Sequence, residues 1–162
     1  MSFLTRAFAP ADLPTLHAIR AAAFAPIFAS FRSIVGPEIA ALGLATAEQE
    51  QADLLDAIAK LDSSHAIAIA ESGSTVIGFV SWKNDPATKI GEITLNAVHP
   101  DYGGKGVGTA LYEHALAALK AAGMQLATVG TGGDPSHDPA RRAYEKAGFT
   151  KHIPSIYMYR RL

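Results

Sequence analysis

Apolar and polar residues alternate with two different periods along this chain, and each change of period marks an expected element. Residues 66–70 and 75–82 are rich in β-branched and alternating apolar side chains, and residues 71–74 (Glu-Ser-Gly-Ser) between them are typical of a hairpin turn. Residues 90–98 repeat the strand pattern after a turn at residues 84–86. The pattern therefore predicts three successive antiparallel strands in the middle of the chain.

Helical spacing of apolar residues precedes these strands. Residues 12–24 and 46–61 each present an apolar face with a period near 3.6 residues. Thr46 followed by Gln49 predicts a capping box at the start of the second helix. Pro26 has no N–H to donate, so we expect it to end or kink the first helix.

The remaining pattern completes a mixed α/β sheet. Further elements are expected at residues 3–8 (an edge strand), 107–119 (a helix), 125–129 (a strand parallel to 90–98), 138–147 (a helix), 150–153 and 155–160 (two closing strands). Together these predictions give a mostly antiparallel sheet of about seven strands flanked by four helices.

A glycine-rich turn, residues 99–109 (HPDYGGKGVGT), joins the last of the three strands to the next helix. Glycine lets the backbone approach a ligand closely, and the N-terminus of a helix attracts a phosphate. The spacing does not match a P-loop, because Lys105 is followed by Gly106, nor a dinucleotide fingerprint, whose third glycine would fall on Thr109 or Leu111. The turn therefore predicts an anion site of another kind.

Residue by residue, this turn resembles the acetyl-coenzyme A loop of the GNAT N-acetyltransferases, written Gln/Arg-x-x-Gly-x-Gly/Ala after a strand that ends Val-x-Pro. Gly106 and Gly108 match the loop glycines. Val98 and Pro100 match the end of the strand. The family's usual Arg or Gln falls on Gly103, so one expected side chain is missing.

A second stretch, residues 140–149 (ARRAYEKAGF), resembles the family's Asn-x-x-Ala-x-x-Leu-Tyr-Glu-Lys-x-Gly-Phe, with the family's Asn falling on His137. The helix and strand expected between the two motifs also follow the family's order. The resemblance implies one GNAT acyl-CoA N-acyltransferase domain over residues 1–162, with acetyl-CoA as co-substrate and no metal. It implies transfer to a primary amine of a small molecule or to an exposed amino group of a peptide, and by analogy it is compatible with a homodimer.

The resemblance also implies two catalytic residues. An alkyl amine such as lysine, with a pKa of about 10.4, is mostly protonated at neutral pH, so the reaction needs a base. Glu92 matches the glutamate that acts as general base in some members, directly or through a water, and His99 is an alternative base. Tyr144 matches the phenol that protonates the leaving thiolate. The structural alternatives are a surface-facing glutamate and a core tyrosine.

Coenzyme contacts are expected from main-chain amides at the end of the strand, from the glycine-rich turn and from the second motif. The expected coenzyme-binding residues are Ala97, Val98, Gly103, Gly104, Lys105, Gly106, Val107, Gly108, Thr109, His137, Arg141 and Tyr144. On the acceptor side we expect Glu92 together with Phe28 and Phe31. The two phenylalanines lie in a segment interrupted by prolines and Gly36, which is interpreted either as a substrate lid or as part of the core.

Composition narrows the classes of function. The 162 residues carry a formal net charge of −1, and basic pairs occur only at Arg141-Arg142 and Arg160-Arg161, so a nucleic-acid partner is not expected. With no cysteine, disulfides, thiolate metal sites and cysteine nucleophiles are excluded. No leader is recognised, and no apolar run is expected to approach the ~18 residues of a membrane span, so we expect a cytoplasmic protein without a membrane partner. A non-catalytic acyl-CoA-binding module and an acyltransferase with another acyl donor or acceptor stay open as alternatives.

Overall fold

The computed structural model describes residues 2–60 and 63–162, and its strands follow the predicted order. The described residues form a five-stranded sheet in the order β1-β2-β3-β4-β5. The first four strands pair antiparallel, and β5 pairs parallel to β4. The strands are β1 (Leu4–Ala7), β2 (His65–Ser72), β3 (Thr75–Asp85), β4 (Ile90–Val98) and β5 (Leu126–Val129).

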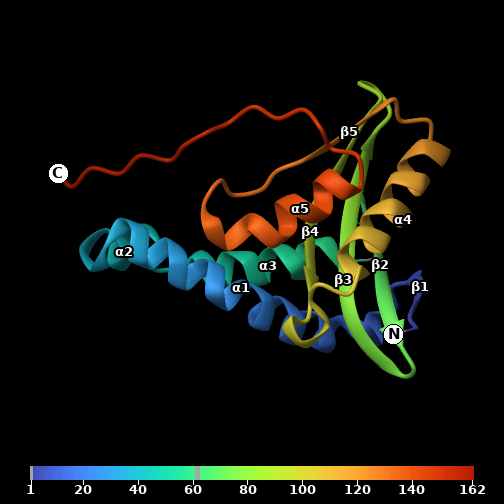
Figure 1. Ribbon diagram of the computed structural model, residues 1–162, viewed down its shortest axis with the longest axis horizontal. Helices are drawn as coiled ribbons and strands as arrows, with labels where there is room; N and C mark the ends of the chain where they lie inside the picture. The colour runs from blue at the N-terminus through green and yellow to red at the C-terminus, as the bar shows by residue number, and fades with distance from the viewer. Residues whose placement is uncertain (1, 61–62) are drawn as a thin grey trace.

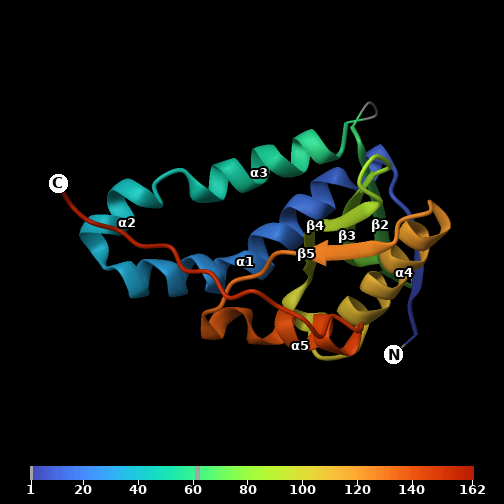
Figure 2. The same ribbon diagram turned by 90° about the horizontal axis from the view of Figure 1, so that it is seen from above.

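Helices cover both faces of this sheet (Figures 1 and 2). They are α1 (Leu13–Val35), α2 (Pro37–Gly43), α3 (Ala47–Ile58), α4 (Val107–Ala121) and α5 (Asp138–Lys146). On one face, Leu16 and Ile19 of α1 and Leu55 of α3 pack against Phe79 of β3 in one buried cluster. On the other face, α4 and α5 pack against the sheet around Trp82 in a second cluster. The sheet therefore separates two cores.

A bulge in β4 decides how the two faces are built. Val80 pairs with Asn96, but Trp82 pairs with Ile93, so Thr94 and Leu95 oppose a single residue of β3. The bulge reverses the alternation of side chains: Ile93 belongs to the α4 core, whereas Leu95 belongs to the α1 core. Within the described residues β5 pairs only with residues 90–93, so β4 has no strand partner on that side from Thr94 onward.

The first helix is longer than predicted. Pro26 does not end it, since α1 continues through Pro26 to Val35, and α2 follows directly. A proline inside a helix costs about 3 kcal/mol, and here the continued helix buries Phe28 beyond it. The segment interpreted either as a substrate lid or as part of the core is therefore helical, not interrupted.

The helix at residues 46–61 differs in detail. It extends over Ala47–Ile58, and the last expected residue, 61, lies outside the described residues. The capping box is not formed: the Thr46 hydroxyl donates to Glu50 at 2.6 Å, and the Gln49 amide donates to Asp53 at 2.7 Å.

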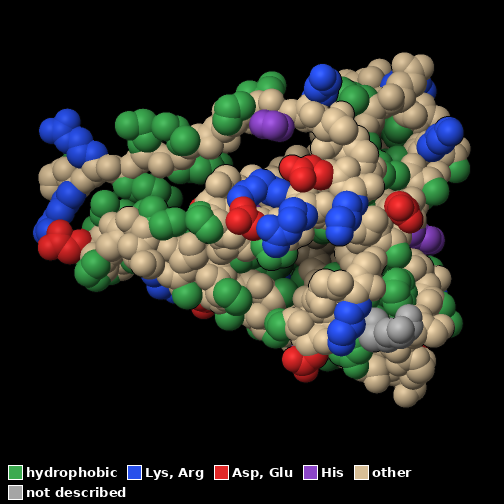
Figure 3. Space-filling view, viewed as in Figure 1, with side chains coloured by type: hydrophobic (Ala, Val, Ile, Leu, Met, Phe, Trp, Pro, Cys, Tyr) green, Lys and Arg blue, Asp and Glu red, His purple; other side chains and the backbone are tan. Residues whose placement is uncertain are grey.

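The prediction of two closing strands at residues 150–153 and 155–160 is also wrong. Residues 150–162 form no strand and run as an exposed, extended segment past α2 (Figure 1). Most of their apolar side chains are exposed, among them Ile156 at 81% (Figure 3), whereas the Tyr159 ring lies against Gly43 of α2. The contacts of this segment include an ion pair between Arg161 and Glu38 at 2.7 Å. A strand-like pattern needs a paired neighbour to become a strand, and this segment has none among the described residues.

One helical stretch, Pro10–Val35, is long and apolar enough to cross a membrane by length and composition alone, with a mean hydropathy of 1.4. The expectation that no such run exists is therefore wrong by this measure. The same stretch packs Leu16 and Ile19 into the core against the sheet, as core helices of globular proteins do.

Candidate active site

The glycine-rich turn ends in the N-terminus of α4. Gly106 is the N-cap, with φ of 83°, and Gly104 has φ of 70°, so both adopt the left-handed conformation that favours glycine. The amides of the first turn, which begins at Val107, have no partner inside the helix, and residues 107–110 include no acidic side chain. The helix dipole and these amides make the turn suitable for a phosphate.

The cation of this turn is folded back onto it. Lys105 Nζ donates to the carbonyl of Asp101 at 2.7 Å and lies 5.2 Å from the centre of the Tyr102 ring. Gly103, where the family usually has Arg or Gln, has an extended backbone with φ of −61°. Lys105 therefore keeps a positive charge beside the α4 N-terminus although the family's side chain is missing at Gly103.

The open edge of β4 presents main-chain amides. The His99 amide donates to the Ile77 carbonyl of β3 at 2.9 Å. Since successive residues of an antiparallel strand point their N–H groups to opposite edges, the Ala97 amide also faces β3, and the Val98 amide faces the open edge. Of the two amides expected to contact the coenzyme, Val98 is thus available and Ala97 is directed into the sheet.

Tyr144 reaches this edge from α5. Asn96 Nδ2 donates to the Tyr144 hydroxyl at 3.0 Å, and the Tyr112 hydroxyl donates to Asn96 Oδ1 at 2.8 Å. The two tyrosine rings stack with centroids 4.4 Å apart, and Tyr144 is 6% exposed. Burial raises the pKa of Tyr144 above its usual value, partly opposed by its hydrogen bonds, and the hydroxyl stays protonated at neutral pH.

Asn96 and Tyr112 were not among the residues expected in the site. The available signal was an amide in a strand otherwise rich in apolar residues, and a phenol on the apolar face of the following helix. The bulge turns Asn96 toward α4 and α5, where Tyr112 of α4 meets it.

Glu92 lies before the bulge and on the other face of the sheet from Asn96. It faces Lys83 across the strand pair, and its carboxylate is 2.8 Å from Lys83 Nζ. The Glu92 side chain is 42% exposed, so water reaches it. His99, the alternative base, accepts a hydrogen bond from the Asp101 amide at 3.3 Å.

The remaining predicted residues meet where the loop after β5 contacts α1. His137 Nδ1 is 2.6 Å from Asp134, and the Phe31 ring stacks on the His137 ring with centroids 5.6 Å apart. Phe28 is buried and contacts Phe31 edge-on, with centroids 6.5 Å apart. Phe28 therefore lies in the core and Phe31 at the junction of α1 with the loop.

The Arg141 side chain binds the loop that precedes α5. Its guanidinium donates to the carbonyls of Gly132 and Asp134 and pairs with Asp138. The exposed cations of α5, Arg142 and Lys146, contribute to the basic side chains that gather over this helix (Figure 3). Arg141 thus shapes the loop, and the neighbouring cations lie on the surface of the helix.

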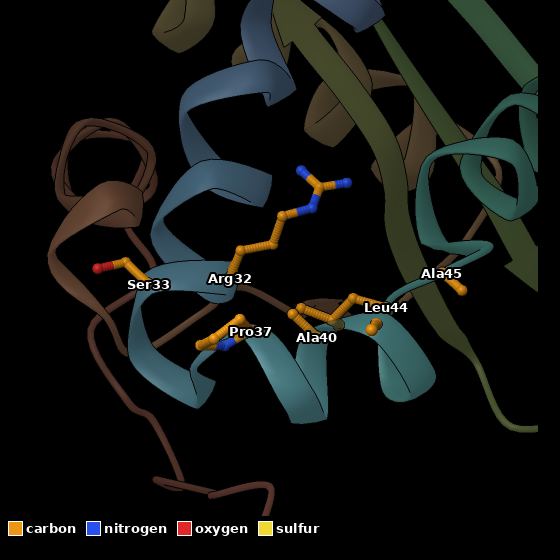
Figure 4. Close-up of a pocket in the computed structure, with 7 residues that line it drawn as sticks. Arg32, Ser33, Pro37, Ala40, Leu44 and Ala45 are labelled. Atoms are coloured by element: carbon orange, nitrogen blue, oxygen red, sulfur yellow. The ribbon is translucent and has the colours of Figure 1, made fainter.

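A cavity of about 580 Å³ lies between α1 and α2. The Arg32 side chain extends from α1 into the space beside α2, and its guanidinium pairs with Glu48 at 2.7 Å (Figure 4). The cavity is lined by Arg32, Ser33, Pro37, Ala40, Ala41, Leu44 and Ala45. It lies in the part of the chain where acceptor contacts were expected, toward the end of the molecule opposite α4 (Figure 1).

The structure is an α/β protein with a mixed sheet, a glycine-rich turn at a helix N-terminus and a buried tyrosine at the open edge of β4. The sequence matches the model of the acetyltransferase (GNAT) family over residues 32–149. The chain therefore belongs to the GNAT acetyltransferase family. Sequence comparison with curated proteins finds no match.

Solved structures agree with this fold. The PaiA N-acetyltransferase of Thermoplasma acidophilum, in complex with coenzyme A, is similar with a TM-score of 0.72 and 20% identity, covering 96% of this chain and 94% of that one. A GNAT family acetyltransferase of Brucella melitensis, in complex with acetyl-CoA, has a TM-score of 0.64 and 19% identity, covering 94% and 92%. A ribosomal-protein-alanine N-acetyltransferase of Brucella melitensis biovar Abortus 2308 has a TM-score of 0.57 and 19% identity, covering 98% and 99%.

Proposed function

We propose that this protein transfers an acetyl group from acetyl-CoA to a primary amine, on a small molecule or at an exposed amino group of a peptide. The observation that carries the proposal is the Tyr144 hydroxyl held by Asn96 at the open edge of β4, beside the phosphate-binding turn of α4. Similar structures bind coenzyme A and acetyl-CoA, and one is named for a ribosomal-protein acceptor, which supports the donor more than any one acceptor.

The chain's own groups then have separate tasks. The first-turn amides of α4 and Lys105 bind the diphosphate of the coenzyme, and the Val98 amide hydrogen-bonds the arm that carries the thioester. Acetyl-CoA supplies the activated acyl group. The Tyr144 hydroxyl donates its proton to the sulfur as the carbon–sulfur bond breaks.

The acceptor amine must lose a proton before it attacks. Glu92 is the proposed acceptor of this proton, directly or through a water, since its carboxylate is accessible on the α1 side of the sheet. Lys83 balances the Glu92 charge and would be displaced in part by an incoming ammonium group.

The first experiment is thermal unfolding with and without acetyl-CoA. A ligand at ~100 times its dissociation constant stabilises the folded state by about 2.7 kcal/mol, which raises the unfolding temperature by several degrees. Coenzyme A release is then measured with amino acids, polyamines, aminoglycosides and peptides. Stabilisation with no release from any amine would favour a binding module, and faster release with a longer acyl donor would favour another acyltransferase. No stabilisation at all would contradict the proposal.

A further inference from the structure

A histidine and an aspartate are paired at the start of α5, apart from the proton-transfer groups proposed above. His137 Nδ1 lies 2.6 Å from Asp134 Oδ1, and the two side chains are only 13% and 12% exposed. The hydroxyls of Ser136 and Ser30 both donate to the other oxygen of Asp134. The Ser30 bond joins the loop to α1, and together the bonds hold the carboxylate in one orientation.

The pairing determines which nitrogen of the ring carries a proton. Burial raises the pKa of Asp134, but hydrogen bonds from Ser136, His137 and Ser30 outweigh burial and hold the pKa below its usual range. Asp134 is therefore ionised at neutral pH and accepts a hydrogen bond from Nδ1–H of His137. The lone pair of the neutral imidazole is then on Nε2.

The ring also has two close neighbours. Phe31 stacks on it, and an added Cβ at Gly132 would overlap its Nδ1–Cε1 edge, so the backbone approaches the ring closely there. His137 Nε2 makes no hydrogen bond to a described residue. Among the described residues, the only fully buried side-chain nitrogen or oxygen without a hydrogen-bond partner is Arg20 Nε. His137 Nε2 is therefore not fully buried, and solvent or a ligand can reach it.

The Asp134–His137 pair is close in the chain to the open edge of β4. It follows β5, whose C-terminal end adjoins the open part of β4. His137 is the N-cap of α5 and Tyr144 lies seven residues later, about two helical turns, so both residues lie along one side of the helix, about 10 Å apart along its axis. The attacking nitrogen and the leaving sulfur are bonded to the same carbon, so the two side chains must converge on that carbon to serve both.

We propose that His137, oriented by Asp134, is a further catalytic residue that takes a proton from the acceptor nitrogen. This inference rests on the proposed function. An ammonium acceptor loses two protons on the way to an amide, and Glu92 takes the first. His137 Nε2 takes the second after the nitrogen–carbon bond has formed, while the carbon–sulfur bond breaks and the sulfur receives the Tyr144 proton. Exchange with water restores all three groups, with one net proton released.

The groups that face the pair set its pH dependence. From α1 they are the neutral Ser30 hydroxyl and Phe31 ring. From its own loop and α5 they are the Asp134 carboxylate and the Arg141 guanidinium, which is bound to the carbonyls of Gly132 and Asp134. Protonation of the imidazole removes the base, so the acidic side of the rate profile should report it.

The test uses His137→Asn, because Asn is the family's residue at this position and can still donate to Asp134. Kinetics are measured from pH 5 to 9 with acetyl-CoA and the amine from the panel that gives the fastest turnover. We expect kcat at pH 8 to fall about 100-fold, the loss of a general base, with KM for acetyl-CoA unchanged and the acidic limb of the rate profile altered. Asp134→Asn, a positioning variant, should lower kcat less and displace that limb. His114→Asn, on α4 beside Trp82, is the matched control and should behave as the wild type.

The opposite results are equally clear. A His137→Asn variant with wild-type kcat and pH profile but altered KM for acetyl-CoA would assign His137 to the coenzyme and overturn the inference, while the proposed acetyl transfer would stand. If that variant does not fold, as judged by circular dichroism, Asp134→Asn and His137→Gln decide by their pH profiles, and an unshifted acidic limb in both overturns it. A wild-type protein that acetylates no amine in the panel overturns both proposals.

Discussion

Asn96 and Tyr144 are 48 residues apart in sequence, yet the Asn96 side-chain amide donates to the Tyr144 hydroxyl at 3.0 Å. This bond ties α5 to the strand at the point where β4 has lost β5 as its neighbour. It places a buried phenol beside main-chain amides of the open edge, which is the arrangement needed to give a proton to a departing thiolate and to hold the acyl group with fixed donors.

Removal of the Tyr144 hydroxyl tests this arrangement. We expect Tyr144→Phe to lower kcat about 100-fold, since general acid catalysis contributes that order of rate, and to leave KM for acetyl-CoA nearly unchanged. Because burial raises the pKa of Tyr144, phenol ionisation should lower the wild-type rate only at a higher pH than it would for an exposed tyrosine. Steady-state kinetics over pH 7 to 10 check both expectations.

Tyr112→Phe is the matched control, because its hydroxyl donates to the same Asn96 and its ring stacks on Tyr144. Each variant should lose about 1 kcal/mol of unfolding free energy, the usual value of one hydrogen bond. Equal losses of kcat in the two variants would show that the network is structural and that Tyr144 has no special part in proton transfer.

The conformation of Gly106 gives a second prediction. With φ of 83° and open space around it, Gly106→Ala meets no clash, so its cost is the left-handed backbone, about 1 to 2 kcal/mol. Acetyl-CoA affinity should fall as well, because the strained N-cap misplaces the first-turn amides of α4.

Gly108→Ala separates backbone strain from loss of a small residue. An added Cβ there would be 3.8 Å from Val98 and 3.9 Å from Ala143, which is ordinary van der Waals contact, and Gly108 lies inside α4. This variant should be more stable than the wild type by about 0.5 to 1 kcal/mol. Urea unfolding of both variants provides the measurement, and a Gly106→Ala protein as stable as the wild type would contradict the assigned strain.

Much of the site follows from local sequence, and its arrangement in space does not. The glycine-rich turn lies where its pattern predicts, and β4 begins and ends at the predicted residues, because glycine conformations and strand periodicity are local properties. The bulge at Thr94 depends on how β4 pairs with β3, so the sequence could not show that Glu92 and Asn96 lie on opposite faces. The pairing of Asp134 with His137 and Ser30 likewise depends on how α1 meets the loop after β5.

Errors in the prediction have the same origin. Pro26 was expected to interrupt a helix on local grounds, but tertiary burial of Phe28 outweighs the local cost. Residues 155–160 have a strand pattern, but pattern alone cannot supply an edge to pair with.

A close approach between Gly91 and α4 predicts a packing defect. An added Cβ on Gly91 would overlap the Leu119 side chain, whose Cγ would be 2.9 Å away, and Leu119 is buried. Gly91→Ala should therefore lower the unfolding free energy by about 1 to 3 kcal/mol, the range for overpacked cores.

The double variant Gly91→Ala with Leu119→Ala tests the contact itself. Leu119→Ala alone should cost about 2 to 5 kcal/mol by leaving a cavity. If the overlap is real, the pair should be more stable than the sum of the two losses predicts. Additive losses in urea unfolding would show that the two residues do not compete for space.

The last prediction concerns the acid stability of the N-terminal strand. Arg6 donates two hydrogen bonds of 2.9 Å to Asp12 and also contacts Glu71. The Arg6 hydrogen bonds lower the pKa of buried Asp12, burial opposes them, and the Ala9 amide lowers the pKa further. A carboxyl whose pKa is lower in the folded state stabilises the fold above its unfolded pKa of about 3.9, and this contribution is lost as pH falls through the folded pKa. Asp12→Asn should therefore cost about 2 kcal/mol of unfolding free energy at pH 7, the order of charged hydrogen bonds, and progressively less below pH 4.

Asp56→Asn is the control, since the pair of Asp56 with His17 is largely exposed and should be worth less than about 1 kcal/mol. Urea unfolding at pH 7 and pH 3 compares the variants, and an Asp12→Asn deficit that is the same at both values would mean that packing, not charge, accounts for it.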